Sequence, residues 1–284
     1  MSLPDPVRRW RRWGFLLLVR GLVGILRRLP VAAARRILHG LARIAWCCLR
    51  TERRIAGRQI ALALPELDDS ARDVLWRSSL LRLADNLLDM IRADAPVAFA
   101  GDGRTLLRGM LDRGPVLLLM AHAGAWELVG PAVVEVTEEF GAITADPHNA
   151  PLGAWLRRER ELRQIRCFDR DREVAAAARW LARGGCLAVL ADHRPRGAST
   201  IAPWFGYPAP TTTGPARLAR AARATILPLG IRRVGQGHQI GLGEPIIPTG
   251  DENVDAARCN GALEDLILRS PEEWTWFHDR YDED

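Results

Sequence analysis

The stretch Val116-Leu117-Leu118-Leu119-Met120-Ala121-His122-Ala123-Gly124-Ala125-Trp126-Glu127 joins a short apolar run to a histidine and then to a glutamate. A short apolar run predicts a buried strand, here over residues 115–121, with His122 where the strand stops. Imidazole is the side chain whose ordinary pKa suits proton transfer from a hydroxyl near neutral pH. We therefore predict a general base, His122, at the mouth of a sheet, with the Glu127 carboxylate as its orienting partner.

The pattern on both sides of this stretch alternates between strand and helix. Helix-like runs cover 125–139, 151–163, 171–183 and 214–223, and further strand-like runs cover 141–145, 164–168, 186–191, 225–232 and 238–242. Such alternation predicts an α/β fold with a mostly parallel central sheet flanked by helices. Ligands of these sheets bind beyond the carboxyl ends of the strands. His122 and Asp192 both fall at such ends, so both are candidate site residues.

The N-terminal part reads as helices of a different character. Between Pro6 and Thr51 there are eleven Arg and no Asp or Glu, and the Arg residues are interleaved with an apolar block at 14–26. A membrane span needs about 20 apolar residues, so this block favours an amphipathic helix that lies on an anionic membrane surface. Nucleic acid is the competing polyanion, but a nucleic-acid arm would be more polar. We expect no nucleic-acid binding.

These patterns divide the chain into two parts. Residues 1–50 form basic amphipathic helices that associate with a membrane, and residues 51–284 form the α/β domain. Within that domain, residues 51–100 are expected to be helical, with two helices separated at Pro65 and a loop over 93–104. The sheet core is expected over 105–284.

Three motifs in order resemble those of a known family. Ala121–Glu127 resembles an HxxxxE block. Asp192-His193-Arg194-Pro195-Arg196-Gly197, followed by Pro203-Trp-Phe-Gly-Tyr-Pro-Ala-Pro-Thr-Thr-Thr-Gly-Pro215, resembles a DQ…G…PFFG.PA.TTTG stretch. Glu273–Arg280 resembles a Trp-rich C-terminal ending. Together they are similar to the lipid A biosynthesis (lauroyl/myristoyl) acyltransferases of the lysophospholipid acyltransferase superfamily, over nearly the whole chain.

The resemblance implies an enzyme that moves a fatty acyl chain from acyl-carrier protein to a hydroxyl of a lipid A precursor. It would work at the cytoplasmic face of the inner membrane of a Gram-negative bacterium, as a peripheral protein or with a single N-terminal anchor. His122 and Glu127 would form the catalytic dyad. The chain has no G-x-S-x-G, which argues against a covalent acyl-enzyme. Direct attack of the hydroxyl on an acyl thioester is the simplest mechanism, with backbone N–H groups or an Arg stabilising the oxyanion.

The resemblance also implies an essential arginine on the segment 155–163. Arg160 is our choice for it, and Arg157, Arg158 and Arg163 remain alternatives because the register is open. Its role would be to bind a phosphate or to stabilise the transition state.

Two further segments are candidates for substrate binding. His193 stands where the family has Gln after the site residue Asp192, which leaves the acceptor contacts at this position open. Thr211-Thr212-Thr213-Gly214 precedes Pro215 and predicts a helix start, which is either a phosphate site or a plain N-cap. His148 lies in a loop and is interpreted as structural, and His39, His238 and His278 as bystanders.

No metal or cofactor is expected, because neither the Cys residues nor the other ligand types show a workable metal spacing. Two alternatives for function stay open. The first is the same chemistry on a lysophospholipid, ornithine lipid or other glycolipid, or with acyl-CoA as donor. The second is a membrane-bound binding protein without catalytic activity.

Overall fold

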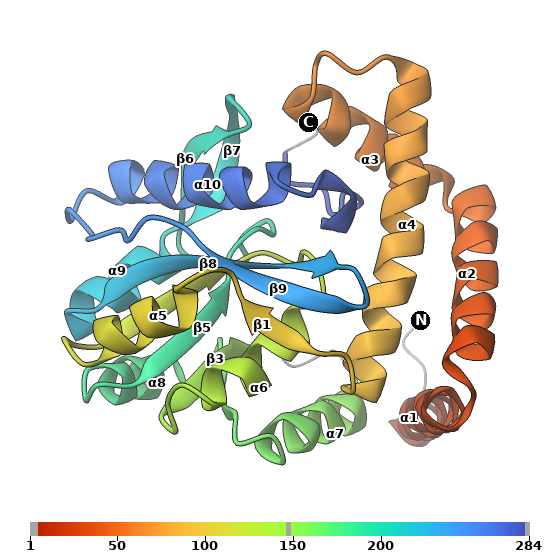
Figure 1. The fold of residues 1–284 in the computed structure, drawn as a ribbon, viewed down its shortest axis with the longest axis horizontal. Coiled ribbons are helices and arrows are strands. Elements are labelled where there is room, and N and C mark those ends of the chain that lie inside the picture. Colours follow the sequence, from red (N-terminus) through yellow and green to blue (C-terminus); the bar gives the residue numbers. More distant parts are fainter. Residues whose placement is uncertain (1–4, 146–148, 282–284) are drawn as a thin grey trace.

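The computed structural model describes residues 5–145 and 149–281, and Figure 1 shows their arrangement. The helices are α1 (Asp5–Arg28), α2 (Val31–Cys48), α3 (Arg50–Ala63), α4 (Asp69–Arg92), α5 (Gly103–Leu111), α6 (Val129–Val134), α7 (Ala150–Glu161), α8 (Val174–Leu181), α9 (Gly214–Ala222) and α10 (Glu252–Leu268), with short 3₁₀ turns η1 (Trp126–Leu128) and η2 (Pro271–Glu273). The strands are β1 (Val97–Phe99), β2 (Val116–Met120), β3 (Phe140–Thr144), β4 (Arg166–Asp169), β5 (Cys186–Leu190), β6 (Ser199–Trp204), β7 (Tyr207–Thr212), β8 (Thr225–Val234) and β9 (Gly237–Leu242).

A seven-stranded sheet forms the centre of the α/β part, in the order β1-β9-β8-β2-β5-β3-β4. Every neighbouring pair is parallel except β8 and β9, which form an antiparallel hairpin. The predicted mostly parallel sheet is therefore confirmed. Strand β2 lies between β8 and β5, so the residue that follows it emerges in the middle of the sheet edge.

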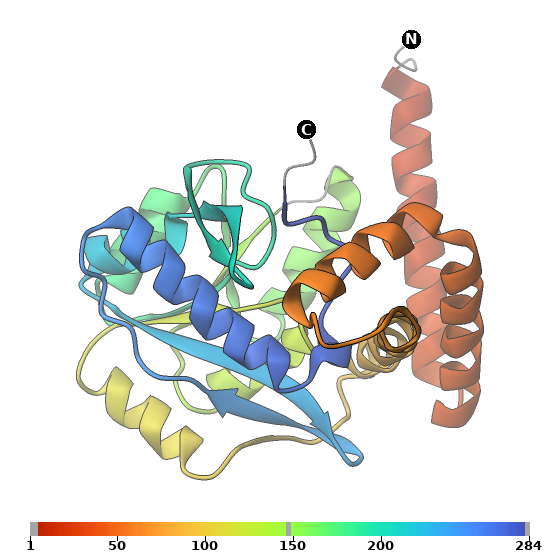
Figure 2. The ribbon, with the colours of Figure 1, turned by 90° about the horizontal axis from the view of Figure 1, so that it is seen from above.

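Helices cover both faces of this sheet, as Figures 1 and 2 show. Leu117 and Leu119 of β2 belong to a buried cluster with residues of α8, α9 and α10. Leu118 and Met120 point the other way and pack in a cluster with residues of α5 and α6. Successive strand residues alternate between the two faces, and both faces are dry, which is why the whole run is apolar.

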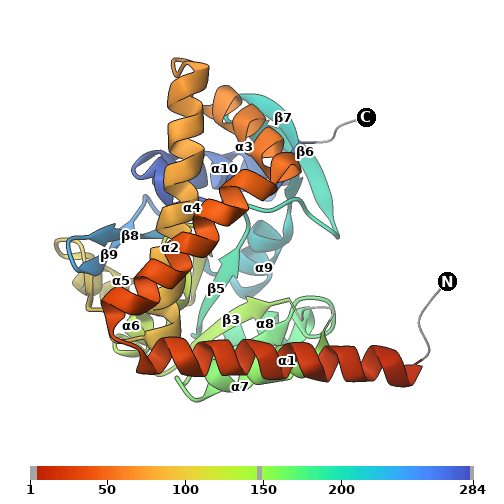
Figure 3. The ribbon, with the colours of Figure 1, turned by 90° about the vertical axis from the view of Figure 1, so that its right-hand side faces the viewer.

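The N-terminal helices form a separate layer beside the sheet. Helix α4 runs along the side of the sheet and packs against α2 and α3, while α1 packs against α4 and α7 (Figure 3). Asp68 fixes the start of α4, because its carboxylate accepts a hydrogen bond of 2.7 Å from the backbone N–H of Ala71. No helix within the described parts of the chain has the length and apolarity needed to cross a membrane.

Several elements differ from the sequence prediction. The expected loop at 93–104 contains strand β1 and leads into α5, and the expected helix at 125–139 is reduced to the turn η1 and the short helix α6. The β6–β7 hairpin and α10 have no counterpart in the prediction. Helix α10 buries polar residues such as Asp255 and Asn260 on its inner face, so its apolar periodicity is weak.

Candidate active site

The loop after β2 holds His122 against the C-terminal segment. Gly124 has a φ of +65° and donates its N–H to the carbonyl of Glu273 at 3.0 Å. A Cβ at this glycine would lie 2.0 Å from the carbonyl oxygen of Ile231, so only glycine fits there. The loop therefore leaves β2 at a fixed angle and places the imidazole at the sheet edge.

Asp192, which follows the neighbouring strand β5, is the carboxylate that binds the imidazole. Its Oδ1 lies 2.8 Å from Nδ1 of His122, and its Oδ2 accepts the backbone N–H of His122 at 2.9 Å. The indole N–H of Trp274 donates to the same Oδ2 at 2.8 Å. Asp192 is completely buried, and it is held by three hydrogen bonds.

The environment keeps Asp192 ionised. Burial by itself would raise its pKa, but the charge of His122 and the hydrogen bonds from His122 and Trp274 outweigh burial and lower the pKa below its ordinary value. An ionised carboxylate is an acceptor only, so Nδ1 of His122 carries the proton of this hydrogen bond. In a neutral imidazole with this tautomer, the lone pair lies on the other ring nitrogen, Nε2.

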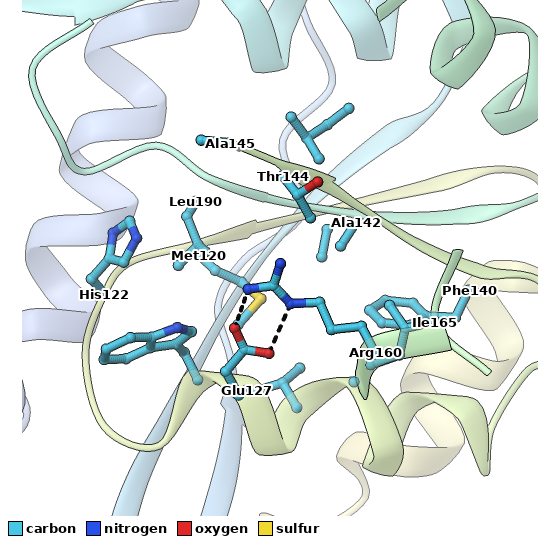
Figure 4. A pocket seen from close by; sticks show the side chains of 15 residues that line it. Met120, His122, Glu127, Phe140, Ala142, Thr144, Ala145, Arg160, Ile165 and Leu190 are labelled. Atoms are coloured by element: carbon cyan, nitrogen blue, oxygen red, sulfur yellow. Dashed lines mark hydrogen bonds and ion pairs between the residues drawn. The ribbon is translucent and has the colours of Figure 1, made fainter. Parts of the chain in front are cut away.

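Glu127 has a different partner from the one that the sequence indicated. Its two carboxylate oxygens accept hydrogen bonds from Arg160, at 2.5 Å from Nη2 and 3.1 Å from Nε, as the dashed lines in Figure 4 mark. No hydrogen bond or ion pair joins Glu127 to His122 among the residues that the structure describes. The predicted contact between Glu127 and the imidazole is therefore not confirmed, because the turn η1 directs this carboxylate to α7.

The contact with Glu127 also changes the pKa of Arg160. Burial of the guanidinium would lower its pKa, but the hydrogen bonds and charge of Glu127 raise the pKa above its ordinary value. Arg160 is therefore a permanent cation in a fixed, bidentate geometry. The other candidate arginines do not bind Glu127. Arg157 donates to the carbonyl of Cys167 at 3.1 Å, and Arg158 is exposed. Arg163 lines a neighbouring pocket between α1, α4 and α7, which Glu127 and Arg160 also line.

His122, Glu127 and Arg160 line one cavity, which we call the apolar cavity (Figure 4). Its volume is about 290 Å³. The rest of its lining is almost wholly apolar and comes from β2, α6, β3, β5 and the residues around them: Met120, Trp126, Val129, Gly130, Phe140, Ala142, Ile143, Thr144, Ala145, Ile165, Ala188 and Leu190. The arrangement places an imidazole and a cation at the polar end of an apolar space.

A second histidine stacks on the imidazole of His122, and a third packs against the second. The ring of His193 lies parallel to that of His122, with centroids 3.8 Å apart and 7° between planes. The centroid of the His278 ring lies 3.7 Å from that of His193, and the two rings are tilted by 33°. Burial, together with the charges of His122, His278 and Arg280, lowers the pKa of His193 to about 3 against the opposing effect of Asp192. His193 is therefore neutral at physiological pH.

The fold also gathers potential metal ligands that sequence spacing did not indicate. His122, Asp192 and His193 have ligand atoms that all lie within 4.8 Å of one another. Both oxygens of Asp192 already accept hydrogen bonds, and lone pairs of parallel stacked rings lie in parallel planes and do not converge. The geometry favours a hydrogen-bonded acid–base pair.

Only part of the predicted substrate-binding segment 211–214 lines a cavity. Thr211 is buried, and its hydroxyl bonds with Asn260 and Arg280, which is a structural role. Thr213 is buried at the N-cap of α9. Thr212 and Gly214 line a second cavity, described below. His148 lies outside the described residues.

Sequence reasoning missed two residues of the site. Trp274 binds Asp192, and His278, interpreted as a bystander, stacks on His193. Both belong to the C-terminal segment Glu273–Arg280, whose resemblance to the Trp-rich family ending was the available signal.

An imidazole on a buried carboxylate, beside an apolar cavity in an α/β fold, fits the class of enzymes that act on an apolar substrate. More narrowly, the chain belongs to the family of bacterial lipid A biosynthesis acyltransferases, whose profile matches residues 5–283.

Characterised relatives agree with this family. The chain is 26% identical over 288 residues to the lipid A biosynthesis lauroyltransferase of Escherichia coli strain K12, covering 96% of this chain and 92% of the relative. It is 25% identical over 246 residues to the lipid A biosynthesis palmitoleoyltransferase of the same strain, covering 82% of this chain and 79% of the relative. A lipid A biosynthesis acyltransferase of Shigella flexneri matches with the same identity and coverage.

Proposed function

We propose that the protein transfers a fatty acyl chain from acyl-carrier protein to a hydroxyl group of a lipid A precursor. Family membership and the names of the relatives support the reaction and the acceptor. The observation that carries the proposal is the His122–Asp192 pair at the polar end of the apolar cavity.

In the proposed mechanism His122 is the general base. With its proton held on Nδ1 by Asp192, the imidazole takes the proton of the acceptor hydroxyl on Nε2. The hydroxyl oxygen then bonds to the thioester carbon, and the carbonyl π electrons move onto its oxygen. When the carbonyl re-forms, the carbon–sulfur bond breaks, and the departing thiolate takes the proton from the imidazolium. The products are the ester and the carrier thiol.

Arg160 is the proposed stabiliser of the oxyanion. Two of its donors are used by Glu127, and a guanidinium has further N–H groups for a developing negative charge. In this scheme Glu127 is a positioning residue, which acts by fixing the guanidinium at the edge of the apolar cavity.

The apolar cavity is the proposed site for the acyl chain. Its wall includes Met120, Phe140 and Ile165, which offer no polar group to a bound chain. Burial of methylene groups in such a space is favourable by about 0.8 kcal/mol per group. The thioester at the head of the chain would lie between His122 and Arg160.

The N-terminal helices are proposed to place the protein on the cytoplasmic face of the inner membrane. On α1, Trp10, Leu17 and Leu18 are 79%, 65% and 67% exposed, whereas Leu16 and Leu26 pack inward. Exposed apolar side chains among arginines suit insertion at an anionic lipid surface. The same basic surface would attract the acidic carrier protein.

The test is acyl transfer by the purified full chain. Acyl-carrier thioesters of several chain lengths, and acyl-CoA, are offered with a tetra-acylated disaccharide bisphosphate, a lysophospholipid or an ornithine lipid, and products are detected by mass spectrometry. We expect one acyl group to be added to the disaccharide from the carrier thioester. Transfer only to another lipid would replace the acceptor, and no transfer from any thioester would favour a non-catalytic binding protein.

A further inference from the structure

A second cavity, which we call the basic cavity, adjoins the apolar cavity. Its volume is about 680 Å³, and its lining includes Arg170, Arg194, Arg196, Arg217 and Arg220. The two cavities share Ile143 and Leu190 as lining residues. His193, which stacks on the base His122, also lines the basic cavity. A substrate that reaches the base can therefore extend into it.

The charges of this lining are not balanced. Arg170 lies 3.6 Å from Asp171, and Arg217 lies 3.4 Å from Glu252. Arg220 donates to the carbonyl of Gly250 at 2.9 Å. Among the described residues, Arg196 makes neither a hydrogen bond nor an ion pair. Even without Arg194, four guanidinium groups around one space, with two nearby carboxylates, leave a positive potential that an anion would stabilise.

Donors of a second kind line the same space. Thr212, at the end of β7, and Gly214, the first residue of α9, line this space, and the positive end of the α9 dipole lies there. The Thr212 hydroxyl accepts the N–H of Gly214 at 3.2 Å, and its own O–H can donate to a ligand. Arginine forks and this hydroxyl together match the oxygens of a phosphate. Leu218 and Ala221 add an apolar wall.

We propose that the basic cavity binds a phosphate ester of one of the two substrates while the reacting group lies at His122. This inference rests on the proposed function. The phosphate has two sources: the head group of the acceptor glycolipid, or the phosphopantetheine of the acyl donor. Arg196 and Arg217 carry most of the binding, because within 5–145 and 149–281 Arg196 has no partner and Arg217 has only the partly exposed Glu252.

The experiment combines a double variant with removal of each phosphate. KM is measured for the full chain with Arg196→Ala/Arg217→Ala, using a bisphosphorylated or a dephosphorylated acceptor and a carrier thioester or an S-acyl pantetheine. Hydrogen bonds to charged groups predict that KM rises roughly tenfold to a hundredfold for the substrate that places its phosphate here. Removing that phosphate should raise the wild-type KM similarly and abolish the difference between wild type and variant. The substrate for which this happens is the source.

The matched control is Arg179→Ala/Arg183→Ala, which removes two exposed arginines that line neither cavity. Inhibition of wild type by inorganic phosphate, the simplest probe, should weaken in the Arg196/Arg217 variant and not in the control. The inference is overturned if the Arg196→Ala/Arg217→Ala variant has the same KM as wild type. It is also overturned if the variant's KM rises equally with substrates that lack the phosphate. A wild-type protein that transfers no acyl group instead overturns the proposed function.

Discussion

At the scale of the residue, the carboxylate that binds His122 follows a different strand of the sheet from the histidine itself. His122 and Asp192 are 70 positions apart, yet they follow neighbouring parallel strands and meet at 2.8 Å. Glu127, five positions from the histidine, binds Arg160 instead. Asp192 thus binds His122, and Glu127 binds Arg160, so each pair can be tested separately.

The Glu127–Arg160 pair should behave as one unit. Arg160→Gln removes the guanidinium, and Glu127→Gln removes the carboxylate that fixes it. We expect kcat for acyl transfer to fall by roughly tenfold to a hundredfold in either variant. Because both changes break the same bidentate contact, kcat of the double variant should be no more than about twofold below kcat of the less active single variant. Multiplicative losses in this double-mutant cycle would show that Glu127 acts independently of Arg160.

His193 should make stability depend on acid pH. Its pKa is about 3 in the folded protein and 6.5 ordinarily, so below pH 6.5 the unfolded chain binds a proton that the folded one does not. Stability therefore falls as pH drops from 6.5 towards 3, by about 2 kcal/mol at pH 5. His193→Gln should reduce the drop in Tm between pH 7 and pH 5. An identical drop in the variant would contradict the assigned neutrality of this ring.

The position of His122 was predictable from sequence, but its partner was not. An apolar run with a polar residue at its end locates the carboxyl edge of a strand. Which strands are neighbours depends on topology, and Asp192 became the partner only because β5 pairs with β2. Arg160 was chosen through the family resemblance, and geometry distinguishes it from Arg157 by the contact with Glu127.

At the scale of the element, the short helix α6 sets the width of the apolar cavity. Gly130 lies on α6 and lines the cavity together with Ile165. A Cβ at Gly130 would lie 2.3 Å from Cδ1 of Ile165, the flexible end of a side chain. A larger residue there must displace Ile165 and change the shape of the apolar cavity.

Gly130→Ala should therefore alter acyl-chain selectivity. We expect kcat/KM to shift towards shorter acyl thioesters by roughly tenfold, since a few lost methylene contacts cost 1–3 kcal/mol in total. Gly109→Ala in α5 is the matched control, because a Cβ there meets nothing within 4 Å. An unchanged chain-length profile in Gly130→Ala would argue that the acyl chain lies elsewhere.

Helix α1 allows a test of membrane association without removing buried residues. Leu17→Glu/Leu18→Glu replaces two exposed apolar side chains with negatively charged ones. Binding to anionic vesicles should fall by at least about tenfold in a sedimentation assay. Val74→Glu in α4 changes a residue that is 62% exposed on a different helix and serves as control. Equal sedimentation of both variants would mean that α1 is not the contact.

The elements that sequence reasoning missed share a physical cause. Strand β1 has three residues, too few to show a periodicity. In β6 and β7, Pro203, Pro208 and Pro210 lie in a small hairpin outside the main sheet, where no central ladder demands their N–H groups. Apolar runs in the central sheet gave the clearest signal because both of their faces are buried.

At the scale of the whole molecule, the site depends on segments from both ends of the domain. β2 and β5 supply the base and its carboxylate, α7 supplies Arg160, and the C-terminal segment supplies Trp274 and His278. The two cavities meet beside the stacked histidines, so an apolar chain and a charged head group can lie on either side of one base. The N-terminal helices pack beside this unit on α4 and α7.

The most direct measurement is the rate of acyl transfer to the disaccharide acceptor by wild type, His122→Gln and Asp192→Asn, each with a native near-ultraviolet circular dichroism spectrum. The account predicts that both variants lose at least about a hundredfold in kcat, because one lacks the base and the other presents an amide N–H that favours the wrong tautomer. A folded His122→Gln or Asp192→Asn protein that transfers acyl groups within about twofold of wild type would contradict it.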